Sequence, residues 1–200
     1  MSITNKNIAL NHAITTTGTG PVSLLATSNG GGTLVIAANG DIVANNDVEL
    51  TATGGISTAG DVTTNAAGAP VNYNSATTLT GNIAIDTTGG GATGSDVNFD
   101  VTLDGTFNLT VTAGTTGSVT FTGLVGDTAA LSAILINSAN NVDTNGVKAA
   151  SFVQTTGQGT TTLDQGDFTP ETDEALTTTG ATGVSITNKN IALNHAITTT

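Results

Sequence analysis

Four acidic side chains are the residues of this sequence best suited to hold a metal ion. Asp167, Glu171, Asp173 and Glu174 occur within one short segment. Carboxylate oxygens are ligands that Ca²⁺ prefers, but the spacing matches neither an EF-hand loop nor the Gly-Gly-x-Gly-x-Asp repeat of calcium-binding β-rolls. We therefore expect a solvated, protruding loop over residues 166–180, with calcium as the only metal that these residues suggest and no other cofactor.

The sequence offers no convincing set of catalytic residues. His12 and His195 occupy one position in two copies of the same motif, and the chain has no cysteine. No Gly-x-Ser-x-Gly nucleophile motif is present, and the glycine-rich stretches lack the Lys-Ser/Thr pair of a phosphate-binding loop. A carbohydrate-active β-helix enzyme would need basic or aromatic sugar platforms, yet the chain has no Trp, no Arg and a single Tyr, Tyr73. We expect no enzyme activity.

Charge and composition restrict the partners and the location of the chain. Among 200 residues, 15 are acidic and 3 are lysine or arginine, so the formal net charge is −12. Such a polyanion repels nucleic acid and anionic membrane surfaces, and no apolar run approaches the ~20 residues that span a bilayer. A composition rich in Thr, Gly, Ala and Asn without cysteine is typical of exported structural proteins, so we expect an extracellular or bacterial cell-surface location.

A sixteen-residue sequence occurs twice without a change. SITNKNIALNHAITTT fills residues 2–17 and again residues 185–200, an offset of 183 residues. The sequence therefore predicts one full tandem repeat unit over residues 1–184 and the start of the next unit over residues 185–200.

Short runs of alternating apolar and polar residues, separated by turn signals such as Asn39-Gly40 and Asp104-Gly105, predict an all-β fold. Within residues 97–103, the alternation places Val97, Phe99, Val101 and Leu103 on one face. The predicted strands span residues 22–26, 33–38, 41–44, 48–52, 82–86, 97–103, 107–113, 118–125, 133–138, 151–154 and 160–164.

Two all-β architectures fit this pattern. One is a β-solenoid, a right-handed β-helix, of about eight rungs per 183-residue unit, because a rung needs roughly 20–25 residues. The alternative is two tandem immunoglobulin-like β-sandwiches of about 90 residues each. We favour the solenoid, because Asn and Thr recur near turns, where stacked rungs can form side-chain ladders, and no Trp is available for a sandwich core.

Three phrases between Gly117 and Leu163, GSVTFTGLVG, ALSAILINSANNV and GVKAASFVQTTGQGTTTL, resemble the β-strand repeats of giant bacterial surface adhesins of the filamentous-haemagglutinin type. DVELTATGGISTAGDVTTNA, residues 47–66, is a shorter match. The resemblance implies an exported β-helix or β-rich shaft at the cell surface with roles in cell adhesion or biofilm. It supplies no catalytic residues.

The sequence thus predicts a spacer shaft with adhesive or self-associating surfaces. Its partners would be neighbouring repeats, other copies joined head to tail, or a cell-surface glycan or protein. A self-assembling extracellular filament subunit is the alternative, since the end of a solenoid offers unpaired strand edges. A further alternative is an ice-binding solenoid, suggested by Thr triplets such as residues 15–17.

Overall fold

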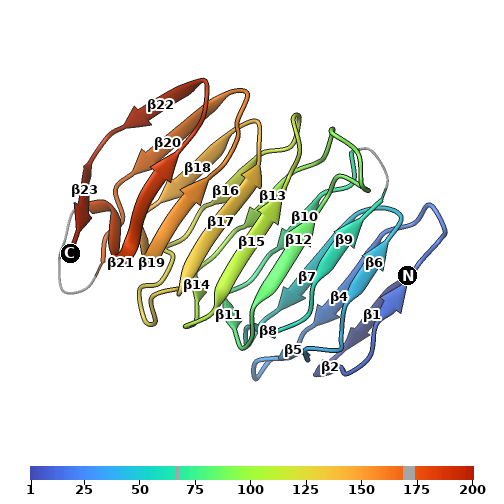
Figure 1. Ribbon diagram of the computed structural model, residues 1–200. Helices are drawn as coiled ribbons and strands as arrows, with labels where there is room; N and C mark the ends of the chain where they lie inside the picture. The colour runs from blue at the N-terminus through green and yellow to red at the C-terminus, as the bar shows by residue number, and fades with distance from the viewer. Residues whose placement is uncertain (66–67, 169–173) are drawn as a thin grey trace.

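The chain is an all-β solenoid of about eight turns in a computed structural model that describes residues 1–65, 68–168 and 174–200. Its strands form three parallel sheets, and each of the first five turns contributes one strand to every sheet. Sequential strands therefore lie on different sides, and neighbours within a sheet come from successive turns. The two termini lie at opposite ends of the solenoid (Figure 1).

Within each sheet, the strands follow one another along the solenoid in chain order. The first sheet has nine strands: β1 (Ser2–Asn5), β4 (Val22–Ala26), β7 (Val48–Ala52), β10 (Val71–Tyr73), β13 (Val97–Phe99), β16 (Val119–Phe121), β18 (Val142–Asn145), β20 (Thr160–Asp164) and β22 (Asn190–Leu193). The second sheet has five: β2 (Ile8–Leu10), β5 (Leu34–Ile36), β8 (Ile56–Thr58), β11 (Thr77–Leu79) and β14 (Leu103–Asp104). The third sheet has nine: β3 (Ile14–Thr15), β6 (Ile42–Ala44), β9 (Val62–Thr64), β12 (Ile83–Asp86), β15 (Asn108–Thr112), β17 (Ala133–Ser138), β19 (Val147–Gln154), β21 (Glu174–Ile186) and β23 (Ala196–Thr199).

The second side of the solenoid continues beyond its fifth strand through parts of longer strands. Val125 forms parallel bridges with Leu103 of β14 and with Val147, the first residue of β19. Val147 is in register with Leu176 of β21, and Leu176 is in register with Ile197 of β23. The starts of β19 and β21, followed by β23, therefore extend the line of the second sheet to the C-terminal end.

The two identical sixteen-residue copies occupy different sides of the solenoid. In the first copy, the SITN, IAL and IT segments form β1, β2 and β3 on the first, second and third sides. In the second copy, Ser185–Ile186 ends β21 on the third side, IAL lies in β22 on the first side, and IT lies in β23 on the line of the second sheet. Each segment of the second copy therefore lies on the side that precedes the side of its counterpart in the first copy. The repeat begins on the first side of the first turn and again on the third side of the eighth turn, so 183 residues correspond to seven turns and two sides.

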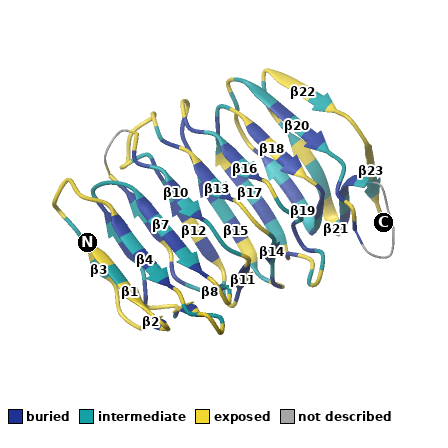
Figure 2. Ribbon diagram, turned by 180° about the vertical axis from the view of Figure 1, so that it is seen from behind, coloured by how far each residue is buried: buried dark blue, intermediate teal, exposed yellow. Residues whose placement is uncertain are grey.

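Side chains that point inward form columns along the solenoid, because parallel strands stack in register. All columns merge into one hydrophobic core that extends along the solenoid (Figure 2). From the second turn on, one column of the first sheet contains six buried valines followed by two other residues: Val22, Val48, Val71, Val97, Val119, Val142, Thr161 and Ile191.

Three aromatic rings stack in the neighbouring column of the first sheet. The ring centroids of Tyr73 and Phe99 are 4.7 Å apart, and those of Phe99 and Phe121 are 5.4 Å apart, with nearly parallel planes. All three side chains are buried. An aromatic core of this kind is absent from the sequence-based prediction, because residues 26 and 22 apart in sequence meet only once the turn lengths are known.

The structure confirms the β-solenoid of about eight turns and shows that the two-sandwich alternative is wrong, since the described strand pairs are parallel between successive turns. Two predicted strands, over residues 97–103 and 118–125, are too long, because β13 ends at Phe99 and β16 ends at Phe121. Val101 is 40% exposed, because the chain ends β13 at Phe99 and turns a corner before Leu103. The described residues contain no helix long and apolar enough to cross a membrane.

Candidate functional site

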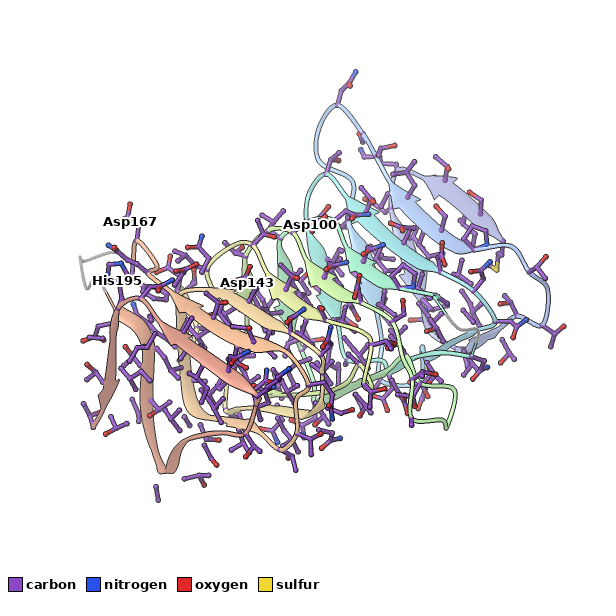
Figure 3. The ribbon with its side chains drawn as sticks, turned by 90° about the horizontal axis from the view of Figure 1, so that it is seen from above. Asp100, Asp143, Asp167 and His195 are labelled. Atoms are coloured by element: carbon purple, nitrogen blue, oxygen red, sulfur yellow. The ribbon has the colours of Figure 1, made fainter. Side chains whose placement is uncertain are left out.

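The four acidic residues predicted as weak metal ligands are described only in part. Glu171 and Asp173 lie outside the described residues, whereas Asp167 is exposed near the C-terminal end (Figure 3). Glu174 does not begin a free acidic loop, because residues 174–180 belong to β21 and the side chains of Ala175 and Leu176 are buried. That part of the predicted loop over residues 166–180 is therefore wrong.

The carboxylate of Glu174 is held by two threonines. The Thr177 hydroxyl donates to Oε2, and the Thr198 hydroxyl donates to Oε1 at 2.8 Å. These two hydrogen bonds lower the pKa of Glu174, with a further contribution from the charge of Lys148. Glu174 therefore ties β23 to β21, and both of its carboxylate oxygens already have a donor within the protein.

Acid should loosen the last strand through Glu174. Its pKa is lower in the folded chain than in the unfolded chain, so the stability that it contributes is present above the unfolded value and is lost as the pH falls through the folded value. We expect the amide of Thr200, which bonds to the carbonyl of Thr178 at 3.0 Å, to lose protection from hydrogen exchange below about pH 4.5, after correction for the intrinsic rate.

The Glu174→Gln variant is the control for this acid effect, because its amide oxygen can accept a hydrogen bond at every pH. Its protection should vary less with pH than that of the parent chain. An identical acid dependence in both proteins would show that Glu174 does not hold β23 in place.

The two histidines do not converge on a site. His12 lies in the first turn and His195 in the last, and both are exposed. Within the described ranges, no group of three or more His, Asp or Glu side chains could hold a metal ion.

A polar ladder covers part of the outer face of the first sheet. Asn98 Nδ2 donates to Asn72 Oδ1 at 2.7 Å, and Asn72 Nδ2 donates to Glu49 Oε1 at 2.6 Å. Asn74 Nδ2 donates to the other Glu49 oxygen at 3.0 Å and to Thr51 Oγ1 at 3.1 Å. Side chains thus join three successive turns in addition to the backbone bonds. Glu49, Asn72 and Asn98 lie within the strands, whereas the sequence-based prediction places side-chain ladders near the turns.

The same face carries carboxylates farther toward the C-terminus. Asp100 and Asp143 are exposed at separate points along the solenoid (Figure 3). Partial burial, and then the nearby charge of Asp164, raise the pKa of Asp143. Asn194 Nδ2 donates to Asp164 Oδ1 at 2.5 Å. The strands of this sheet contain no lysine or arginine, so its outer face combines amides, hydroxyls and negative charge.

The two ends of the solenoid expose apolar side chains that point inward and form the last members of core columns. At the C-terminal end these residues are Ile191, Leu193 and Ile197, and at the N-terminal end Met1 is exposed. The sequence-based prediction anticipates unpaired edges but names none of these residues. The spacing of Ile191, Leu193 and Ile197 within the repeated sequence, with an odd number of residues between successive members, is the signal that marks these three as inward-pointing.

The part of the chain that the structure describes contains no pocket. Comparison of the chain with protein-family models, with curated proteins and with solved structures finds no match. The candidate functional surfaces are therefore the acidic outer face of the first sheet and the two ends of the solenoid.

Proposed function

We propose that this chain is a structural repeat segment of a secreted or cell-surface bacterial adhesin or fibre, in which it acts as a spacer shaft. The observation that carries the proposal is the set of inward columns that continues from the first turn to the last. Such a column has no natural end within the solenoid, so further turns can be added without changing the cross-section.

The acidic outer face supports the same role. A surface with net negative charge and many amide and hydroxyl groups stays soluble and resists unspecific association along its sides. We propose that it contacts a cell-surface glycan or protein through these polar groups. We propose no catalytic role. The outward columns mix Asn, Glu, Asp and Thr, which does not favour the ice-binding alternative.

The shaft role predicts how length should grow with repeat number. One 183-residue unit spans seven turns and two sides, so at about 4.8 Å per turn each added unit should lengthen the particle by roughly 37 Å. We expect small-angle X-ray scattering of chains with one, two and three units to show this increment with a constant cross-section. An unchanged maximum dimension, or a cross-section that grows with each unit, would contradict the shaft.

A further inference from the structure

The exposed large apolar side chains of this protein are concentrated at its two ends. Six such side chains are exposed among the described residues, and four of them belong to the terminal turns: Met1 is 47% exposed, Ile191 53%, Leu193 52% and Ile197 36%. The other two, Val35 and Val101, lie on the sides of the solenoid and are 44% and 40% exposed. The end residues are exposed for a different reason from the side residues, because they occupy core columns that lack a next turn.

Both ends also carry unpaired strand edges. In the first sheet, β1 pairs only with β4, and β22 pairs only with β20. On the second side, β2 pairs only with β5, and β23 pairs only with β21. All these pairs are parallel, so the free edges at the two ends face in opposite directions along one axis and can complement each other.

The columns at one end continue those at the other. Ile191 ends the column whose first position is Met1, because Ser2 is in register with Ser23 and Met1 therefore precedes Val22. Leu193 ends the column that begins with Ile3. Ile197 ends the second-side column that begins with Ile8. Each exposed apolar residue of the last turn thus has an apolar counterpart in the first turn.

We propose that the last turn is a docking surface for the first turn of a second copy of this chain, with β1 of the copy beside β22 and β2 of the copy beside β23. This contact buries Ile191 against Met1 of the copy, Leu193 against Ile3 and Ile197 against Ile8. It extends two sheets by one strand each in the same parallel register. The inference deepens the proposed shaft role by naming a partner for the ends, and the two can fail separately.

The contact joins two different surfaces, so it does not close on itself. A head-to-tail contact that is not closed by rotation produces an open rod, whereas a self-complementary contact would stop at a dimer. The register is fixed by the period of two along the strands, because a shift of one residue would place the polar, outward-facing Ser2 and Thr4 of the copy against Ile191 and Leu193.

Sedimentation of the intact chain over a concentration series tests the association. We expect species larger than a dimer to accumulate with concentration, and Ile191→Asp/Leu193→Asp to weaken association by at least tenfold. The matched control is Val35→Asp/Val101→Asp, which places the same two charges at similarly exposed apolar positions on the sides and should leave association unchanged. Circular dichroism would confirm that each variant keeps its strands. If both double variants weakened association equally, or if the parent chain stayed monomeric at every concentration, the proposed contact between the last turn and the first turn of a copy would be wrong.

The register can be tested by disulfide trapping, because the chain has no cysteine of its own. Residues 3 and 193 lie at opposite ends of one molecule, so a bond between them must join two molecules. Under mild oxidation, we expect Ile3→Cys/Leu193→Cys to give a ladder of covalent oligomers. Ile3→Cys/Ala192→Cys should give far less, because position 192 points outward. If the two cysteine variants gave equal ladders, or if neither gave a ladder, the proposed pairing of Leu193 with Ile3 of the copy would be wrong. If these tests exclude end-to-end docking while chains with more tandem units still lengthen by the predicted increment, the proposed shaft role is retained without the docking of separate copies.

Discussion

Replacing Phe99 by alanine is expected to lower the free energy of unfolding by about 3–5 kcal/mol. Phe99 is 1% exposed and lies between the rings of Tyr73 and Phe121 in the core of the first sheet. Its removal leaves a cavity between two turns that are tied together by backbone bonds and cannot close on each other. It also removes both ring contacts, each worth about 0.5–1.5 kcal/mol beyond the buried area.

The control for this prediction is Phe99→Leu, which keeps most of the apolar volume and loses the stacking. We expect it to cost about 1–2 kcal/mol. Denaturant unfolding followed by circular dichroism measures both variants. If Phe99→Ala lowered the free energy of unfolding by no more than Phe99→Leu does, the aromatic column would not be a main source of stability in the middle turns.

Alkaline conditions should destabilise the chain through Tyr73. Its hydroxyl is buried without a hydrogen-bond partner among the described residues, and burial, with a smaller effect of Asp61, raises its pKa well above the ordinary value of 10. Above about pH 10 the unfolded chain releases this proton while the folded chain keeps it. The unfolded state then binds fewer protons, so stability falls with rising pH, by about 1.4 kcal/mol per pH unit until the folded pKa is reached.

The Tyr73→Phe variant isolates this effect, since Tyr73 is the only tyrosine in the chain. Both proteins contain the same three lysines. At neutral pH the variant should be more stable by about 1 kcal/mol, because it removes an unsatisfied buried hydroxyl and retains the ring stack. Above about pH 10 the difference should widen, and tyrosinate absorbance should rise only with unfolding. Tyrosine ionisation in the folded chain would contradict this.

Strands with strict alternation could be predicted closely from the sequence. The predicted bounds of residues 48–52 are those of β7, because Val48, Leu50 and Ala52 alternate with polar residues and turn residues flank them. Short strands such as β8 and β11 could not be found in this way. Each has three residues, and each places a threonine, Thr58 or Thr77, in the core.

Contacts between turns could not be predicted, because the turns differ in length. Val48 and Val71 are 23 residues apart, Val71 and Val97 are 26 apart, and Val142 and Thr161 are 19 apart, yet each pair is in register. The partnership of Glu174 with Thr198 depends on such a register. The sequence therefore indicates which side chains point inward but not which residues lie above one another.

The one-side displacement of the repeated sequence determines the symmetry of any longer array. A unit of seven turns and two sides is not a whole number of turns, so a following identical unit would be related to the first by a screw rotation of about one third of a revolution. A given face, such as the one that carries Glu49 and Asn72, would then point in three directions around the axis and recur in its first direction every third unit. A fibre built in this way could contact neighbours on all sides, although each unit has only one such face.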